Sequence, residues 1–339
     1  MKQILVISDL HFDFLTQNRG YKRVITKFIK QLTTFLLTNR IDGLIIAGDI
    51  SRDLDDVEKL FNALQPLELP KIYVPGNHEL FLDIDIQTLV PPDELTNPIM
   101  NYILGDGRMD MSIAGDGVNR LWTLTRIAEE NHVSMLHEEP IILFERPKTV
   151  IIGNMGWYNY EQPFENLVSP DILKKKQDAI DLDRLFDSDE GHNYKGHSYK
   201  LQFFDPNTLF WKYLYMCVKY QIQLIKQMEF EHLLFLSHYI PLSNCIPYKR
   251  SLDVFDHILK NEKAYKWFYA QVTDLIQQSG LKIDAYIFGH RHSPCRNAAY
   301  ICNPFVKSSH LQKNGEQAYH PRYNDDFTRY FQAGLFNLE

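Results

Sequence analysis

Short apolar runs alternate, over the first 80 residues, with segments whose apolar residues recur every three or four positions. Residues 4–7 form the first apolar run, whereas the apolar residues between 22 and 38 follow the helical spacing. A short apolar run predicts a buried strand, and the helical spacing predicts an amphipathic helix packed on it. Strands that alternate with helices favour a largely parallel sheet with right-handed crossovers.

The same pattern continues, with interruptions, along the rest of the chain. It is lost over residues 81–140 and 160–203, so we expect insertions or substrate-selecting loops there, within a single domain of residues 1–339. The tail from residue 305 onward has no clear assignment. The predicted strands are residues 4–7, 44–47, 72–74, 150–152, 233–236 and 285–288, and the predicted helices are residues 22–38, 53–64, 121–131, 209–228 and 264–276.

Polar side chains follow five of the predicted strands at the point where each apolar run ends. Asp9 and His11 are two residues apart, and in an extended chain such residues point to the same side. Ligands of largely parallel sheets gather at the carboxyl ends of the strands, so these residues are expected to meet. The set consists of Asp9, His11, Asp49, Asn77, His78, His238, His290 and His292.

Carboxylate, imidazole and amide groups in one set are typical ligands of manganese, iron or zinc. Seven of these eight residues, all but His78, are candidate ligands. Seven exceed what one tetrahedral ion needs, so two ions that share a bridging carboxylate fit the number better. Any one of these histidines, taken alone, is more often structural than ligating. Taken together, five polar strand ends would each cost free energy if buried without a partner, which favours a shared metal site.

Composition and charge limit the class of protein. The formal net charge of -7 argues against a broad nucleic-acid-binding face, although bound metal ions could still attract a phosphate-bearing substrate. The four cysteines include no C-x-x-C pair and no dense disulfide framework, so a reducing cytoplasm is the expected location. The sequence shows no secretory signal and no apolar run long enough to cross a membrane, and no membrane partner is expected.

Five short motifs stand in the order found in the calcineurin-like metallophosphoesterases, and the chain resembles that family over residues 1–80 and 230–305. The resemblance implies an α/β fold, a four-layer α/β/β/α sandwich in which two mixed β-sheets pack face to face. The motifs are D-x-H at 9–11, G-D at 48–49, G-N-H-E at 76–79, His238 after a strand, and G-H-x-H at 289–292.

The resemblance also assigns roles to individual residues. His78 is expected to contact phosphate and protonate the leaving group, and Asp13 and Glu79 are expected to orient imidazoles from outside the ligand set. The first metal would be bound by Asp9, His11, Asp49 and His292. The second would be bound by Asp49, Asn77, His238 and His290, which makes Asp49 the bridge.

The activity implied is hydrolysis of phosphate esters by a dinuclear centre with a metal-bound hydroxide as nucleophile. Manganese is the expected metal, with iron or zinc as alternatives. Gly48–Asp53 lacks the D-R-G sequence of the protein Ser/Thr phosphatase branch, which favours a bacterial-type enzyme. The expected substrate is a small phosphate ester or a nucleotide, and monoester or diester preference stays open.

Three other functions compete with this interpretation. A DNA or RNA nuclease of the same superfamily is the first. A non-catalytic binding scaffold of the same fold is the second, but such a protein would typically have lost ligands and none is missing here. A single-metal redox site is the third, and it would normally use a facial triad rather than seven ligands.

Overall fold

The computed structural model describes residues 2–15, 21–80, 115–156, 206–241, 272–290, 292, 294–296, 299–306 and 326–338. The helices are α1 (Phe12–Leu15), α2 (Tyr21–Thr38), α3 (Leu54–Leu64), α4 (Asn77–Leu80), α6 (Gly115–Glu130), α9 (Pro206–Ile225), α10 (Thr273–Ser279) and α11 (Thr328–Ala333). The strands are β1 (Lys2–Ile7), β2 (Gly43–Ala47), β3 (Lys71–Val74), β4 (Ser134–Met135), β5 (Ile141–Glu145), β6 (Lys148–Gly153), β7 (His232–Leu236), β8 (Ala285–Ile287), β9 (Cys295–Arg296), β10 (Tyr300–Cys302) and β11 (Leu335–Leu338).

The strands form two mixed sheets. The first has the order β11-β1-β2-β3-β4, and only its edge strand β11 is antiparallel to its neighbour. The second has the order β5-β6-β7-β8-β10-β9, with antiparallel strands at both edges. The parallel strands in each sheet are the near-continuous apolar runs of the sequence, because both of their faces are covered.

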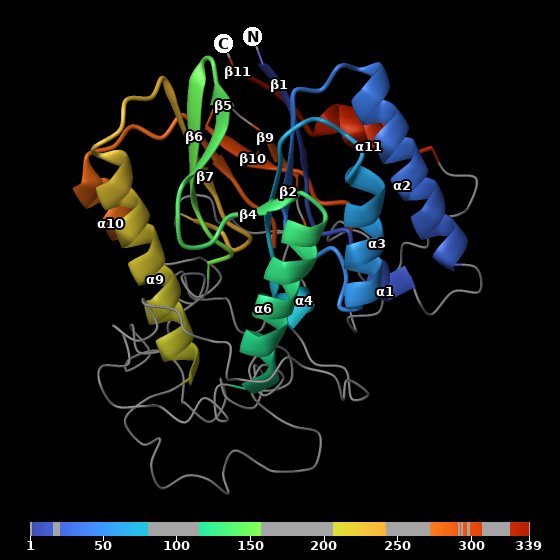
Figure 1. Ribbon diagram of the computed structural model, residues 1–339, viewed down its shortest axis with the longest axis horizontal. Helices are drawn as coiled ribbons and strands as arrows, with labels where there is room; N and C mark the ends of the chain where they lie inside the picture. The colour runs from blue at the N-terminus through green and yellow to red at the C-terminus, as the bar shows by residue number, and fades with distance from the viewer. Residues whose placement is uncertain are drawn as a thin grey trace, which may run out of the picture.

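The two sheets pack face to face, and helices cover their outer faces (Figure 1). Alternate residues of β1 show this arrangement, since Ile4 and Val6 belong to the core between the sheets while Leu5 and Ile7 belong to the core beneath the helices. Figure 1 places α9 and α10 on one outer side and α2, α3 and α6 on the other. The predicted four-layer α/β/β/α sandwich is confirmed.

The two helices predicted in the first 80 residues form as α2 and α3, whereas the four-residue helices α1 and α4 were not predicted. All seven buried residues of α2 recur at intervals of three or four, so one face of the helix is in the core. Helix α3 begins after Asp53, whose side chain caps it by accepting a hydrogen bond of 3.0 Å from the amide of Asp55. The sequence therefore determines both the face and the start of these helices.

Five strands were not predicted from the sequence. Strands β4, β9 and β10 contain only two or three residues, too few to show a period. Strands β5 and β11 lie at sheet edges and are partly exposed. The apolar run of residues 141–144 in β5 was not assigned, whereas Asn337 interrupts the short run of β11. Strand β11 is stabilised by pairing with β1 at the other end of the chain, which a local pattern does not reveal.

The regions with predicted insertions are described in part. Residues 115–135 contribute α6 and β4, and β4 pairs with β3 in the first sheet. Residues 81–114 and the whole of 160–203 lie outside the described residues, as does most of the helix predicted over 264–276. No helix among the described residues is long and apolar enough to cross a membrane.

Candidate metal centre

All eight predicted site residues lie just beyond the carboxyl ends of β1, β2, β3, β7 and β8. The ends of these strands meet at one edge of the sandwich, where α1 and α4 also lie (Figure 1). The ligand atoms of one group are all within 4.8 Å of one another, and the same holds for a second group. The first group is Asp9, His11, Asp49 and His292, and the second is Asp49, His238 and His290.

The backbone at this edge takes a left-handed conformation that residues other than glycine rarely adopt. The φ angles are positive at five of the eight predicted residues, which is uncommon and costs on the order of 1–3 kcal/mol each. Strand β1 ends at Ile7, so the shared direction of Asp9 and His11 comes from this turn and not from an extended chain as predicted. The five angles are 50° at Asp9, 45° at His11, 55° at Asp49, 61° at His290 and 52° at His292.

The first group brings two carboxylates and two imidazoles together. The Nε2 atoms of His11 and His292 are 3.2 Å apart. Asp49 Oδ2 lies 3.5 Å from His11 Nε2, and Asp9 Oδ1 lies 3.8 Å from His292 Nε2. Ligand atoms bound to one ion at about 2.0–2.2 Å would be separated by roughly 3–3.5 Å, close to these distances.

The second group brings an amide oxygen between two imidazoles. Asn77 Oδ1 lies 3.1 Å from His238 Nε2 and 3.1 Å from His290 Nδ1. Asp49 Oδ2, the same oxygen that faces His11, lies 3.3 Å from His238 Nε2. One carboxylate oxygen is therefore placed between the two groups.

The residues fit metal ions on chemical grounds. Asp9 and Asp49 are at most 1 % exposed. Among the described residues, their charged contacts come only from histidines, not from lysine or arginine. Buried carboxylates are strongly destabilising unless they are paired or coordinate a metal, so a cation at each group would compensate for their charge.

The protonation states of the group members depend on burial. Burial raises the pKa of Asp9, and a bound cation would oppose this by favouring the carboxylate. Burial also lowers the pKa values of His11 and His290 well below the usual range, which keeps both imidazoles neutral and able to ligate. Burial would raise the pKa of Asp49, but the neighbouring His238 and His78 outweigh burial and hold the Asp49 pKa well below its usual value.

Backbone carbonyls fix the orientation of two imidazoles. His238 Nδ1 lies 2.8 Å from the carbonyl oxygen of Ala47, and His292 Nδ1 lies 2.9 Å from that of Val306. An Nδ1–H that donates to a carbonyl leaves the Nε2 lone pair for a metal. In both residues, Nε2 is the atom that faces the predicted ligand group.

His78 lies at the border of the two groups, beside Asp49 and Asp13. Its amide donates to Asp49 Oδ1 at 3.0 Å, and its ring Nδ1 lies 3.1 Å from Asp13 Oδ2. Burial lowers the pKa of His78, but the carboxylates of Asp49 and Asp13 outweigh it and raise the pKa to about 9. Asp13 thus orients an imidazole, as the sequence suggested, and the two carboxylates favour the protonated form of His78.

The Glu79 carboxylate binds backbone amides and does not orient an imidazole as predicted. Its carboxylate accepts hydrogen bonds from the amides of Asp49, Ile50 and Gly76. These bonds join the turn after β2 to the turn after β3. A Cβ atom on Gly76 would lie 2.1 Å from Asp49 Oδ1, so glycine is the residue that lets the two turns approach.

Two further residues support the centre and were missed from the sequence. The buried guanidinium of Arg120, on α6, donates to the carbonyl oxygens of Glu79, at 2.7 Å, and of Arg52. The ring of Tyr239 lies 4.4 Å from that of His290. Arg120 is 41 residues from Glu79, and no local pattern could have indicated the contact.

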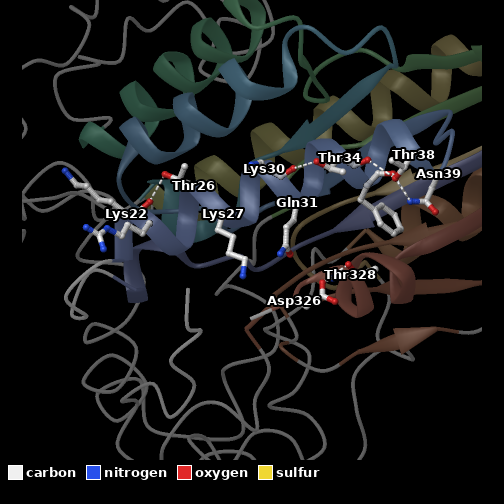
Figure 2. Close-up of a pocket in the computed structure, with 12 residues that line it drawn as sticks. Lys22, Thr26, Lys27, Lys30, Gln31, Thr34, Thr38, Asn39, Asp326 and Thr328 are labelled. Atoms are coloured by element: carbon white, nitrogen blue, oxygen red, sulfur yellow. Dashed lines mark hydrogen bonds between the residues drawn. The ribbon is translucent and has the colours of Figure 1, made fainter. Parts of the chain in front are cut away.

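A groove of about 910 Å³ lies along α2 (Figure 2). None of the eight predicted site residues lines it. One wall is α2 and the other includes Asp326 and Thr328 at the start of α11. Its basic residues are Lys22, Arg23, Lys27 and Lys30.

Comparisons with solved structures and with sequence families show what the chain is similar to. Three solved structures match over 91–92% of the chain. Phosphopantetheinyl hydrolase from Mycobacterium tuberculosis is 17% identical in sequence, the match covers 90% of its own chain, and the TM-score is 0.53. A dimetal phosphatase from Danio rerio is 14% identical, 90% covered, with a TM-score of 0.39. The phosphoesterase YfkN from Bacillus subtilis is 11% identical, 82% covered, with a TM-score of 0.38.

The sequence gives a more direct assignment than these distant structures, of which the hydrolase from Mycobacterium tuberculosis, with a TM-score of 0.53, shares the fold. No protein with a curated function matches the chain significantly. The sequence profile of the calcineurin-like phosphoesterases matches residues 2–294, which include all eight predicted site residues. The chain therefore belongs to the calcineurin-like phosphoesterase family.

Proposed function

We propose that this protein hydrolyses phosphate esters with two divalent metal ions, one at each ligand group. The observation that carries the proposal is the position of Asp49, whose Oδ2 lies 3.5 Å from His11 Nε2 and 3.3 Å from His238 Nε2. When bound, two such ions supply an activated water at neutral pH and neutralise the charge of the phosphoryl group. Manganese as the metal and the cytoplasm as the location stay predictions from the sequence.

In this proposal the protein side chains have separate tasks. Asp9, Asp49 and Asn77 supply oxygen ligands, and the histidines of the two groups supply nitrogen ligands. His78 acts as the general acid, because its imidazolium can donate a proton to the leaving oxygen. Asp13 keeps the ring of His78 in place through the contact at Nδ1.

The proposed substrate class is a small phosphate ester or a nucleotide. The formal net charge of -7 supports this, because extended polynucleotides are bound mainly by clustered positive charge. Bound ions at the edge of the sandwich would attract a single phosphate group without any such cluster.

A nucleic-acid diesterase is the second candidate. It is favoured by the groove along α2, where four lysine or arginine side chains line one wall (Figure 2). Each contact with a backbone phosphate releases counterions, so binding through this groove would weaken steeply with salt. The test measures cleavage of single-stranded DNA or RNA by the wild type and by the double variant Lys22→Glu with Lys30→Glu. Loss of this cleavage in the variant, with hydrolysis of a small ester retained, would support this candidate.

The test compares hydrolysis of bis-p-nitrophenyl phosphate with that of p-nitrophenyl phosphate, with Mn²⁺ added and then removed by a chelator. Chelator-sensitive release from the diester supports a diesterase, and release from the monoester alone supports a phosphatase. If metal is bound but neither ester is hydrolysed, general phosphoesterase activity is contradicted. A binding scaffold or a narrowly selective enzyme would then be supported. Asp55→Asn, an exposed substitution on α3, is the control for effects of removing a carboxylate.

A further inference from the structure

Cys295 and Cys302 face each other across the β9–β10 hairpin. The two strands are antiparallel, and these two residues are direct partners in the register. The Cα atoms of directly opposed residues in such a pair are about 4.5–5.5 Å apart, whichever type of pair they form. A disulfide requires a Cα separation of about 4.4–6.8 Å, so the two sulfurs could be joined with little movement of the backbone.

Both side chains lie on the same face of the sheet. Cys302 belongs to the core beneath the helices, and Cys295 packs against that same core while remaining partly exposed. Both are thiols in this structure. An oxidant from solvent can therefore reach Cys295, while Cys302, which is 2 % exposed, is the buried partner beside it.

The hairpin is connected directly to the metal centre. It begins three residues after His292, and the carbonyl of Val306, beyond its second strand, lies 2.9 Å from His292 Nδ1. The Cys302 thiol donates a weak hydrogen bond of 4.0 Å to the carbonyl of Gly289, which directly precedes His290. The hairpin thus contacts the turn that carries two predicted ligands.

We propose that Cys295 and Cys302 form a reversible disulfide that responds to a peroxide. The Cys295 thiolate attacks one oxygen of hydrogen peroxide, the O–O bond breaks, and one water leaves after protonation, giving a sulfenic acid. The Cys302 sulfur then attacks the sulfenic sulfur, the S–O bond breaks and a second water leaves. The two thiols lose two protons and two electrons in total, and the peroxide is reduced to two waters.

Formation of this disulfide would change the contacts of the turn at Gly289. The Cys302 sulfur would lose its hydrogen and with it the hydrogen bond to the Gly289 carbonyl. Its position would also become fixed by Cys295. We expect the oxidised protein to release metal several-fold faster than the reduced protein, an effect that rests on the proposed function.

The experiment treats the full-length, metal-loaded protein with hydrogen peroxide in small excess, followed by peptide mapping under non-reducing conditions. The expected product is a peptide pair linked through Cys295 and Cys302, lighter by two hydrogen atoms than the two separate peptides. Dithiothreitol should reduce the link and restore both thiols. The rate of metal release to a chelator is measured in parallel on both forms. Cys217→Ser, which removes a buried cysteine on α9, is the matched control and should still form the disulfide.

Two results would overturn the proposal. One is oxidation of Cys295 to a sulfinic acid, or its linkage to another cysteine, while the native protein forms no Cys295–Cys302 bond. The other is a disulfide that leaves the rate of metal release unchanged, which would show that the hairpin does not influence the centre. If the proposed phosphoesterase activity failed instead, the linked peptide would still be found, so the two failures are distinguishable.

Discussion

The two ligand groups share Asp49 but differ in charge. The first also contains Asp9, so it presents two carboxylates, whereas the second contains Asn77 in the corresponding place and presents one carboxylate and an amide. A cation is attracted more strongly by the group with more negative charge. We therefore expect the first ion to be held more tightly and the second to exchange first when a chelator is added.

The groups also differ in which parts of the fold carry them. Three of the four first-group ligands follow β1 and β2 of the first sheet, while His238 and His290 of the second group follow β7 and β8 of the second sheet. Both groups therefore join the two sheets, but the second group takes two of its histidines from the second sheet and the first group takes only His292. One edge of a sandwich can thus carry two ligand groups of unequal charge around one shared carboxylate.

Asp49→Asn should have the largest effect, because it removes charge from both groups at once. We expect kcat/KM for the preferred nitrophenyl ester to fall by at least about 10³-fold and both ions to bind more weakly. Metal content after gel filtration and steady-state hydrolysis measure this. Full activity with a normal metal content would contradict the bridging role.

Asp9→Asn and Asn77→Leu should separate the two groups. Each substitution should weaken the binding of one ion only. The expected loss of affinity for that ion is at least about 10–100-fold, which is the cost of losing even a residue that only orients a ligand. Titration with Mn²⁺ should show Asp9→Asn affecting the tighter phase and Asn77→Leu the weaker one. Equal loss of both phases in each variant would show that the two groups are not separate sites.

His78→Ala should spare both ions and still impair turnover. Removing a general acid costs about 10²–10⁴-fold, and we expect the fall in kcat to be larger for a poor leaving group than for p-nitrophenolate. Metal content should match that of the wild type. A fall in metal content as large as that of Asp9→Asn would instead make His78 a ligand.

Asp13→Asn should give the smallest effect and move the pH profile. The pKa of His78, about 9, is raised by the carboxylates of Asp49 and Asp13, so the imidazolium is lost as the pH rises through that value. Without the Asp13 charge this loss begins at lower pH, and the alkaline limb of kcat should shift toward neutrality. An unchanged limb would indicate that another group controls it.

Much of this arrangement could be predicted from the sequence, because the strands are near-continuous apolar runs and the ligands follow them directly. Asp9, Asp49 and Asn77 were found in this way, and the structure places their side chains together. The left-handed turns that direct Asp9 and His11 were not predicted, since they arise from packing rather than from glycine.

Contacts between distant segments account for what the sequence did not reveal. Arg120 joins the turns that carry Asp49 and Asn77 from a helix in a region without a clear pattern. Cys295 and Cys302 are seven residues apart, and only the register of a short hairpin shows that they are partners. Such relations depend on the tertiary fold, which a local period does not encode.

Metal content per chain shows directly whether the centre holds two ions that share Asp49. The full-length protein is loaded with Mn²⁺, passed through a gel-filtration column and analysed by plasma mass spectrometry, together with the Asp9→Asn and Asn77→Leu variants. We expect two ions per wild-type chain and partial loss of metal in each variant. One ion per chain in the wild type, unchanged by Asn77→Leu, would contradict the two-ion centre.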